Sequence, residues 1–197
     1  MVKPNAIDLE VARHRFTAAA DEMGAVLRRT GYSPNIKERD DFSTALFVAS
    51  GELLAQAEHI PVHLGSMPAS VQAIIDTFGD RLELDAQYAV NDPYHGGTHL
   101  NDLTIVRPVA FGGDLVGWVA NRAHHSDVGG EAPGSMPAHA TLLSQEGHIV
   151  PPTLSELAMV SGFQSFLIRF SKPREHLRSA TVIYRLSWGR TRSVPAD

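Results

Sequence analysis

The sequence predicts an α+β fold in which a mixed or antiparallel sheet carries flanking helices. Two segments show helical periodicity, and short apolar runs of strand length occur at 42–48, 53–56, 88–90, 103–110 and 115–120. Ser50-Gly51 and Gly112-Gly113 each join two of these runs and are typical of tight turns. Because a tight turn makes its two strands antiparallel neighbours, we expect hairpins within the sheet.

The first helix is predicted over residues 8–30. Apolar and small side chains recur there at steps of three and four, which places on one face Ala12, Phe16, Ala19, Met23, Val26 and Thr30. We expect Asp8 to cap the N-terminus of this helix and Gly31 to end it.

The second helix is predicted to follow Ser66 and to stop at Gly79. Its apolar face is formed by Val71, Ile74, Ile75 and Phe78. The segment before it, residues 59–68, contains prolines and is predicted to be a loop that carries His59 and His63.

Composition excludes several classes of protein. The 197 residues suffice for one domain or a little more, and 43% are hydrophobic and 20% charged, as in ordinary globular proteins. The chain has no cysteine, which excludes disulfides and thiolate metal ligands. No apolar run approaches the roughly 20 residues of a membrane span, and the N-terminus lacks the apolar core of a secretory signal. We therefore expect a cytoplasmic protein with no membrane partner.

The net charge of −5 is unevenly distributed. Residues 1–158 hold 10 Lys and Arg against 20 Asp and Glu, whereas residues 159–197 hold 7 against 2. The acidic body argues against a nucleic-acid partner, since binding to phosphates requires a basic face.

Histidines and carboxylates gather among glycines between Asn91 and Asp127. His99 and Asp102 precede the run 103–110, and His124 follows the run 115–120, so antiparallel pairing would bring the three together. Imidazole and carboxylate ligands without sulfur suit zinc, manganese or iron. We expect a divalent metal site here, with structural hydrogen bonding by loop histidines as the alternative. The adjacent His125 leaves open which of the two histidines is the ligand.

Six further residues are candidates for chemistry near this site, each with a structural alternative. We assign catalytic roles to His125, Asp127 and Asp92, although Asp127 equally suits a cap of the Gly129-Gly130 turn and Asp92 suits a turn before proline. We assign substrate binding to three residues, of which Arg39 can hold a carboxylate in bidentate fashion: Arg39, Asp41 and His63. A solvated loop or charged face is the alternative for these three. No P-loop and no GxSxG nucleophile pattern occurs in the sequence.

Four long stretches resemble the hydantoinase B/oxoprolinase family. They read NIKERDDFSTALF, HIPVHLGSMPASV, NDPYHGGTHLNDLTIVRPV and NRAHHSDVGGEAPGSMP, and they lie in order within residues 8–157. The resemblance implies that this N-terminal region is part of a larger family fold. It also implies a hetero-oligomer with a hydantoinase A-type subunit, which binds ATP and phosphorylates the substrate carbonyl. His99, Asp102 and His124 match the positions that hold a divalent metal in carboxylase relatives.

The resemblance implies a subunit of an ATP-dependent cyclic amide hydrolase, which opens a hydantoin or 5-oxoproline ring. A subunit of an acetone- or acetophenone-type carboxylase is an alternative, and an inactive fragment or assembly piece is another. Residues 158–197 form a divergent basic tail that matches the family poorly. Because family members are considerably longer, we expect the chain to be an N-terminal fragment from a truncated or frameshifted reading frame.

Overall fold

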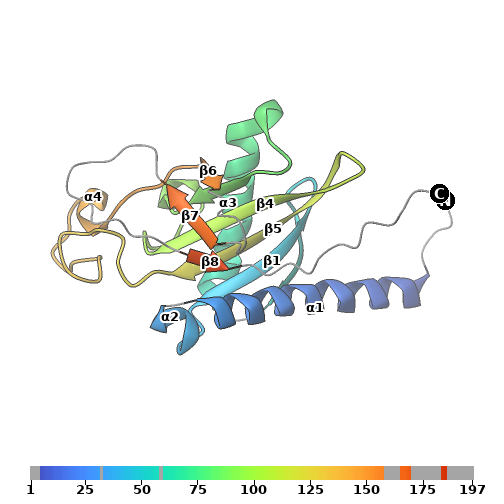
Figure 1. Cartoon of the computed structure of the whole chain (residues 1–197), viewed down its shortest axis with the longest axis horizontal. Helices are drawn as coiled ribbons and strands as arrows, with labels where there is room; N and C mark the ends of the chain where they lie inside the picture. The colour runs from blue at the N-terminus through green and yellow to red at the C-terminus, as the bar shows by residue number, and fades with distance from the viewer. Residues whose placement is uncertain (1–4, 32, 58–59, 158–164, 170–182, 186–197) are drawn as a thin grey trace.

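The eight strands of the described residues form one antiparallel sheet, as the computed structural model shows (Figure 1). The model describes residues 5–31, 33–57, 60–157, 165–169 and 183–185. Strand order across the sheet is β2-β1-β5-β4-β3-β6-β7-β8. The strands are β1 Phe42–Val48, β2 Leu53–Ala57, β3 Gln87–Val90, β4 Asp102–Phe111, β5 Asp114–His124, β6 Thr153–Leu157, β7 Ser165–Arg169 and β8 Ile183–Arg185. The predicted α+β class with an antiparallel sheet is thus confirmed, and most of the predicted basic tail lies outside the described residues.

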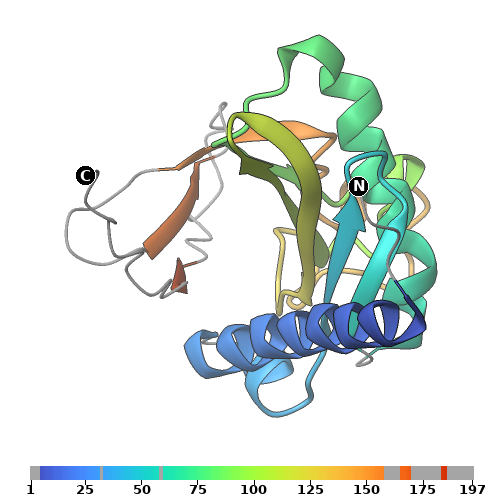
Figure 2. The ribbon, with the colours of Figure 1, turned by 90° about the vertical axis from the view of Figure 1, so that its right-hand side faces the viewer.

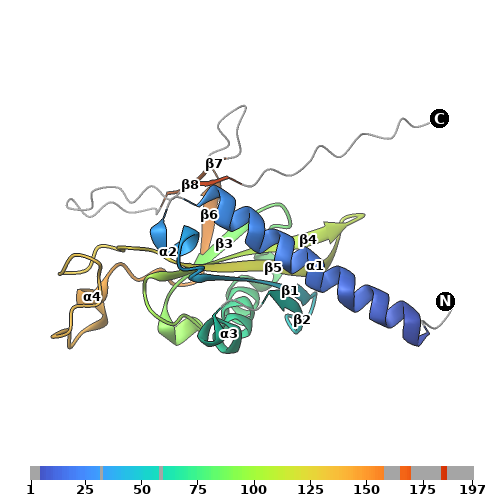
Figure 3. The ribbon, with the colours of Figure 1, turned by 90° about the horizontal axis from the view of Figure 1, so that it is seen from below.

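Two long helices lie on opposite faces of the sheet (Figures 2 and 3). They are α1 Ala6–Thr30 and α3 Pro61–Phe78, and the short helices are α2 Pro34–Lys37 and α4 Leu143–Glu146. Successive side chains of β1 point to opposite faces of the sheet and contact different helices. Thr44 Oγ1 donates to the Ala20 carbonyl of α1, and Ser43 Oγ forms a hydrogen bond with His63 Nδ1 of α3. Among the described residues, no helix is long and apolar enough to cross a membrane.

Helix α1 confirms the predicted element but differs in its cap and its buried face. Asn5, not Asp8, is the N-cap residue, and Asp8 completes a capping box by accepting from the Asn5 backbone N–H at 3.1 Å. The fully buried positions are Ala20, Gly24 and Leu27, in the C-terminal half of the helix. The predicted face lies against the sheet only in part, and its member Phe16 is 39% exposed.

Helix α3 begins earlier than predicted. The segment 59–68 was expected to be a loop, but α3 starts at Pro61, and Pro68 lies within it. Pro61 occupies the first turn, where a backbone N–H has no helical partner, so it begins the helix instead of preventing it. Packing of Met67 and Val71 against the sheet outweighs the single hydrogen bond that Pro68 removes.

The interface between α3 and the sheet is apolar at one end and polar at the other. Met67, Val71 and Ile74 of α3 pack against a cluster that includes Trp118 of β5 and Val106 of β4. Towards the helix N-terminus, the residues on the sheet side are instead His63, Ser66 and Ser70, which bond groups on the sheet or on the loop beside it. The candidate site lies at this polar end.

Candidate metal centre

Strand pairing brings the central residues of the predicted site together. Asp102, the first residue of β4, is paired directly with His124, the last residue of β5. The hairpin that joins these strands turns at Gly112 and Gly113, whose φ angles of 62° and 92° favour glycine. His99 precedes β4 in a turn closed by the Asp102 N–H, which donates to the His99 carbonyl at 2.9 Å. The expected approach of His99, Asp102 and His124 is therefore confirmed.

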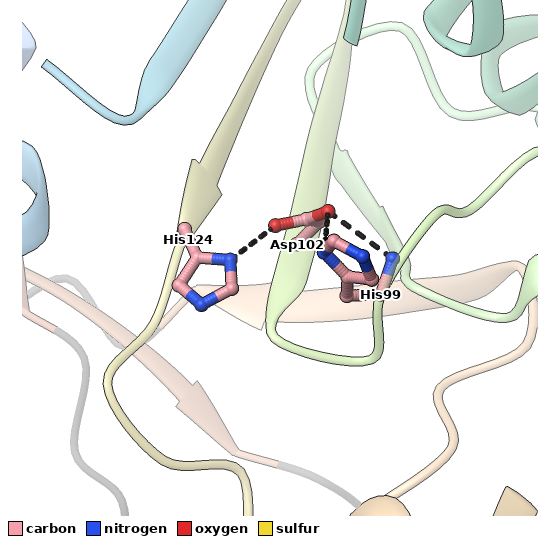
Figure 4. A group of neighbouring side chains, drawn as sticks. All are labelled: His99, Asp102 and His124. Carbon is pink, nitrogen blue, oxygen red and sulfur yellow. Dashed lines mark hydrogen bonds and ion pairs between the residues drawn. The ribbon is translucent and has the colours of Figure 1, made fainter. Parts of the chain in front are cut away.

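The three side chains converge on one point (Figure 4). His124 Nδ1 lies 2.7 Å from Asp102 Oδ1, and His99 Nδ1 lies 3.3 Å from Asp102 Oδ2. One potential ligand atom from each residue lies within 4.8 Å of the others. The two imidazole rings meet edge to face with centroids 6.0 Å apart. Two nitrogens and one oxygen fit a zinc, manganese or iron ion, and the 58% exposure of His99 leaves a path to solvent.

Asp102 is a buried carboxylate that the protein keeps ionised. Burial alone would raise its pKa, but hydrogen bonding outweighs burial and holds the pKa far below the ordinary value. The groups responsible are the His124, His63 and Thr98 side chains and the backbone N–H of His99, which donates to Oδ2 at 3.1 Å. A carboxylate fixed in this way needs no proton loss before it binds a cation.

The surroundings of His124 favour its protonated form. Its hydrogen bond to Asp102 raises its pKa, and burial opposes that effect. Asp41 Oδ2 lies 4.0 Å from His124 Nδ1 and also raises the pKa, whereas the nearby Arg39 charge lowers it. Arg39 and Asp41, both predicted substrate contacts, thus lie on the same side of the cluster as His124. Their role in binding substrate stays a prediction.

His63 lies behind the cluster and not in a solvated loop. It is 1% exposed, its Nδ1 lies 3.2 Å from Ser43 Oγ, and its Nε2 faces Asp102 Oδ2 at 3.8 Å. The alternative of a solvated loop histidine is therefore wrong. Substrate binding by His63 stays a prediction, and burial places the imidazole where it supports Asp102 from within the protein.

His125 and Asp127 lie beyond the end of β5 and are not in the three-residue cluster. His125 is 8% exposed, and its backbone N–H and carbonyl bond the Asn101 carbonyl and side-chain amide at 2.8 and 2.7 Å. Burial, together with the nearby His124 charge, lowers the pKa of His125 to about 4. Asp127 accepts from the Gly129 N–H at 2.7 Å and from the Gly134 N–H at 3.0 Å. These bonds fit the turn-capping interpretation of Asp127, and the catalytic roles of both residues stay predictions.

Asp92 forms a pair with a different histidine. Its Oδ2 lies 2.8 Å from His95 Nδ1, and its Oδ1 accepts from the Tyr94 N–H at 3.0 Å, which caps the short helical turn Pro93–His95. Tyr94, His95 and Gly96 border an open cavity of about 460 Å³ against α3, whose lining includes none of the three ligand candidates. Asp92 therefore stabilises the turn at Pro93–His95, which agrees with the structural role given above as its alternative. Its catalytic role stays a prediction.

Sequence reasoning missed the residues that hold the site in place. Arg122 of β5 is fully buried, and Thr98 donates to Asp102 Oδ2. Asn91 donates to the Leu100 carbonyl at 2.7 Å and so fixes the turn that carries His99. The signal for Arg122 was available, since a charged side chain two residues before His124 shares its strand face.

Comparison with known proteins agrees with these observations. Residues 5–156 match the family model described as hydantoinase B/oxoprolinase. An uncharacterized protein of Methanocaldococcus jannaschii is 50% identical over 75% of this chain and 27% of its own length. The 5-oxoprolinase 1 of Arabidopsis thaliana is 45% identical over 72% of this chain and 11% of its own length.

A solved structure shows the same fold. The crystal structure of the ATP-dependent caprolactamase from Pseudomonas jessenii matches with a TM-score of 0.68 and 29% identity, over 78% of this chain and 26% of that chain. The chain thus spans about a quarter or less of the length of the relatives it matches. With a family model that covers residues 5–156, this chain belongs to the hydantoinase B/oxoprolinase family.

Proposed function

We propose that this chain supplies the divalent-metal site of an ATP-dependent hydrolase that opens cyclic amides such as hydantoins or 5-oxoproline. The observation that carries the proposal is the convergence of His99, Asp102 and His124 within the region shared with 5-oxoprolinase 1. The whole activity belongs to an assembly larger than the matched region, so it is proposed here and not assigned to this chain alone.

Each ligand would come to the metal in a different state. Asp102 is already ionised and fixed, while the His99 side chain is 58% exposed and open to solvent. The hydrogen bond to Asp102 raises the pKa of His124, so a metal would compete with a proton for this imidazole. A bound divalent metal supplies a Lewis acid for a substrate oxygen and lowers the pKa of bound water.

Two charged residues near His124 are candidates for further roles in hydrolysis. Asp41 is 29% exposed and its Oδ2 lies 4.0 Å from His124 Nδ1, which supports a role as the base that accepts a proton from an attacking water. This role differs from the substrate binding predicted for Asp41. Arg39 is exposed on the same side and can hold a carboxylate or phosphate oxygen of the substrate, in keeping with its predicted role.

ATP would act on a partner subunit. The sequence contains no P-loop, whereas the caprolactamase of similar fold is described as ATP-dependent. We therefore infer that a hydantoinase A-type subunit binds ATP and activates the amide, in a hetero-oligomer whose other half carries the metal. The names 5-oxoprolinase and caprolactamase favour hydrolysis over the carboxylase alternative.

Elemental analysis of the purified chain tests the metal site. We expect stoichiometric zinc, manganese or iron in the wild-type chain and its loss in His99→Ala, while His139→Ala, which changes an exposed histidine outside the cluster, retains the metal. Circular dichroism checks that each variant is folded. Metal retained in full by both His99→Ala and Asp102→Asn would refute the ligand assignment.

Turnover requires the partner. The chain, coexpressed with a hydantoinase A-type subunit, should convert 5-oxoproline or a hydantoin only when ATP is present, and Asp41→Asn should slow the reaction without removing the metal. A complex that copurifies with full metal content and converts neither compound would favour an assembly piece over an enzyme subunit.

A further inference from the structure

Arg122 is a fully buried cation beside the candidate metal centre. It lies on β5 two residues before His124, and its partner across the hairpin is Thr104, two residues after Asp102. Because side chains alternate along a strand, Arg122 and Thr104 point to the same face of the sheet as the His124–Asp102 pair. That face is covered by α3. Arg122 therefore occupies the layer directly adjoining the ligands.

The guanidinium joins three separate parts of the chain. Its Nε donates to Thr104 Oγ1 at 2.7 Å, and one terminal nitrogen donates to Ser70 Oγ and to the Gly96 carbonyl, both at 2.8 Å. The other terminal nitrogen donates to Ser66 Oγ. Sheet, helix α3 and the Gly96 turn are thus held by one planar group, whose fork of donors a lysine cannot reproduce.

These four acceptors carry no charge, so the positive charge of Arg122 needs compensation from elsewhere. A buried charge is costly unless an opposite charge lies nearby. Burial lowers the pKa of Arg122 to about 10, and the negative charge of Asp102 opposes that effect in part. Arg122 therefore lies within the electrostatic field of the carboxylate that belongs to the cluster.

The Gly96 turn links Arg122 to His99. The Gly96 carbonyl also accepts from Ser70 Oγ at 2.8 Å, and Gly96 has a φ of 82°. A Cβ at Gly96 would lie 2.3 Å from the Ser70 backbone nitrogen, so this turn packs directly on α3. Three residues later comes His99, and the next carbonyl, that of Leu100, is held by Asn91. The segment that presents His99 is fixed at its start by Arg122 and at its end by Asn91.

We propose that Arg122 is a positioning residue for the metal centre: its guanidinium fixes the Gly96 turn against the sheet and α3, so that His99 is preorganised beside Asp102 for a divalent cation. The inference rests on the proposed metal site. It assigns Arg122 a role through the ligands and not through contact with the substrate. Outer partners of metal ligands of this kind typically contribute about 10- to 100-fold to metal affinity.

Cobalt binding tests the proposal on the full chain. Co²⁺ is titrated into the metal-free protein, and both its dissociation constant and its visible absorption spectrum are recorded for wild type, Arg122→Lys and Ser70→Ala. Arg107→Lys, an exposed arginine on β4, is the matched control. Circular dichroism establishes folding, and hydrogen exchange of residues 96–101 without metal reports the preorganisation directly.

We expect Arg122→Lys to weaken Co²⁺ binding by about 10- to 100-fold, to alter the spectrum and to speed exchange in 96–101. Ser70→Ala should move all three readouts in the same direction by less, since Arg122 keeps its other acceptors, and Arg107→Lys should match wild type. Ser70→Ala carries the test if Arg122→Lys does not fold. The proposal is overturned if folded Arg122→Lys has the Co²⁺ affinity and the spectrum of the wild type, even if its melting temperature is lower. If Arg122→Lys does not fold, the same result for Ser70→Ala overturns it.

The wild-type and His99→Ala titrations separate this proposal from the one on which it rests. Co²⁺ binding that is lost in His99→Ala but unchanged in Arg122→Lys overturns only the positioning role. A wild-type chain that binds no Co²⁺ overturns both.

Discussion

Acid should destabilise this protein through His125 well before it protonates the buried carboxylate. Burial and the nearby His124 charge lower the pKa of His125 from 6.5 to about 4. The unfolded chain therefore takes up a proton near pH 6.5, whereas the folded chain resists it until about pH 4. The stabilisation from neutral His125 is complete above pH 6.5 and is lost as the pH falls through this window.

The size of the loss follows from the shift. One pKa unit corresponds to about 1.4 kcal/mol, and the His125 pKa falls from 6.5 in the unfolded chain to about 4 in the folded chain. The free energy of unfolding therefore decreases by about 3 kcal/mol between neutral pH and a pH at which His125 is protonated in both the folded and the unfolded chain. By the same relation, about 2–3 kcal/mol is lost by pH 4.5 and about 1 kcal/mol by pH 6. Asp102 adds little here, because its lowered pKa confines its own loss of stability to more acidic conditions.

Urea unfolding at a series of pH values measures this effect, with EDTA present so that no metal contributes. The comparison is wild type against His125→Gln, which cannot take up the proton. Both proteins retain His124, whose raised pKa stabilises the fold below pH 6.5 and loses that effect as the pH rises through its folded pKa. The difference between the two unfolding free energies should shrink by about 2–3 kcal/mol from pH 7.5 to 4.5. Parallel curves for the two proteins would refute the reasoning.

Two further predictions concern the fold that carries the site. Gly96→Ala should destabilise the chain by more than 1 kcal/mol, because the new Cβ would lie 2.3 Å from the Ser70 backbone nitrogen and the φ of Gly96 is 82°. Gly112→Ala is the control and should cost less, since there is open space around its Cβ. Equal melting temperatures for the two variants would contradict this prediction. Ile74→Ala, in the core, should cost about 2–5 kcal/mol in urea unfolding, and Val116→Ala, 50% exposed, less than about 0.5 kcal/mol; similar losses would contradict the assigned core.

Local patterns predicted the hairpin strands of the sheet well because hairpins are decided by short-range chemistry, whereas β6, β7 and β8 were not predicted. The glycine turns at 51 and 112–113 and the apolar runs beside them locate β1, β2, β4 and β5 to within a few residues. The start of α3 was missed because Pro61 and Pro68 indicate a loop when only their neighbours are considered. Burial of Met67 and Val71 against strands distant in sequence decided the outcome, and periodicity within one segment does not report such contacts.

The site was predictable in its centre and not in its support. His99, Asp102 and His124 lie at strand ends whose pairing follows from one hairpin, so spacing predicted their approach. Spacing left His124 and His125 as alternatives, and only the family resemblance favoured His124. The partners of Asp102 on α3 and the acceptors of Arg122 come from a helix whose face becomes known only when it docks on the sheet. The positions of these supporting side chains depend on tertiary packing, and the patterns of a single sequence seldom contain that information.

Burial of Asp102 explains why the polar end of the interface is built as it is. A carboxylate in water would bind a cation only after ordering its own rotamer, whereas Asp102 is already oriented by His124, Thr98 and the His99 N–H. That order requires a charged group in the interior, and hydrogen bonds from His124, Thr98 and the His99 N–H outweigh the effect of burial on its pKa. Replacing Asp102 should therefore destabilise both the metal site and the fold, whereas replacing the exposed His99 should affect the metal alone. The two replacements differ because Asp102 is buried and interacts with groups inside the protein, whereas His99 is exposed.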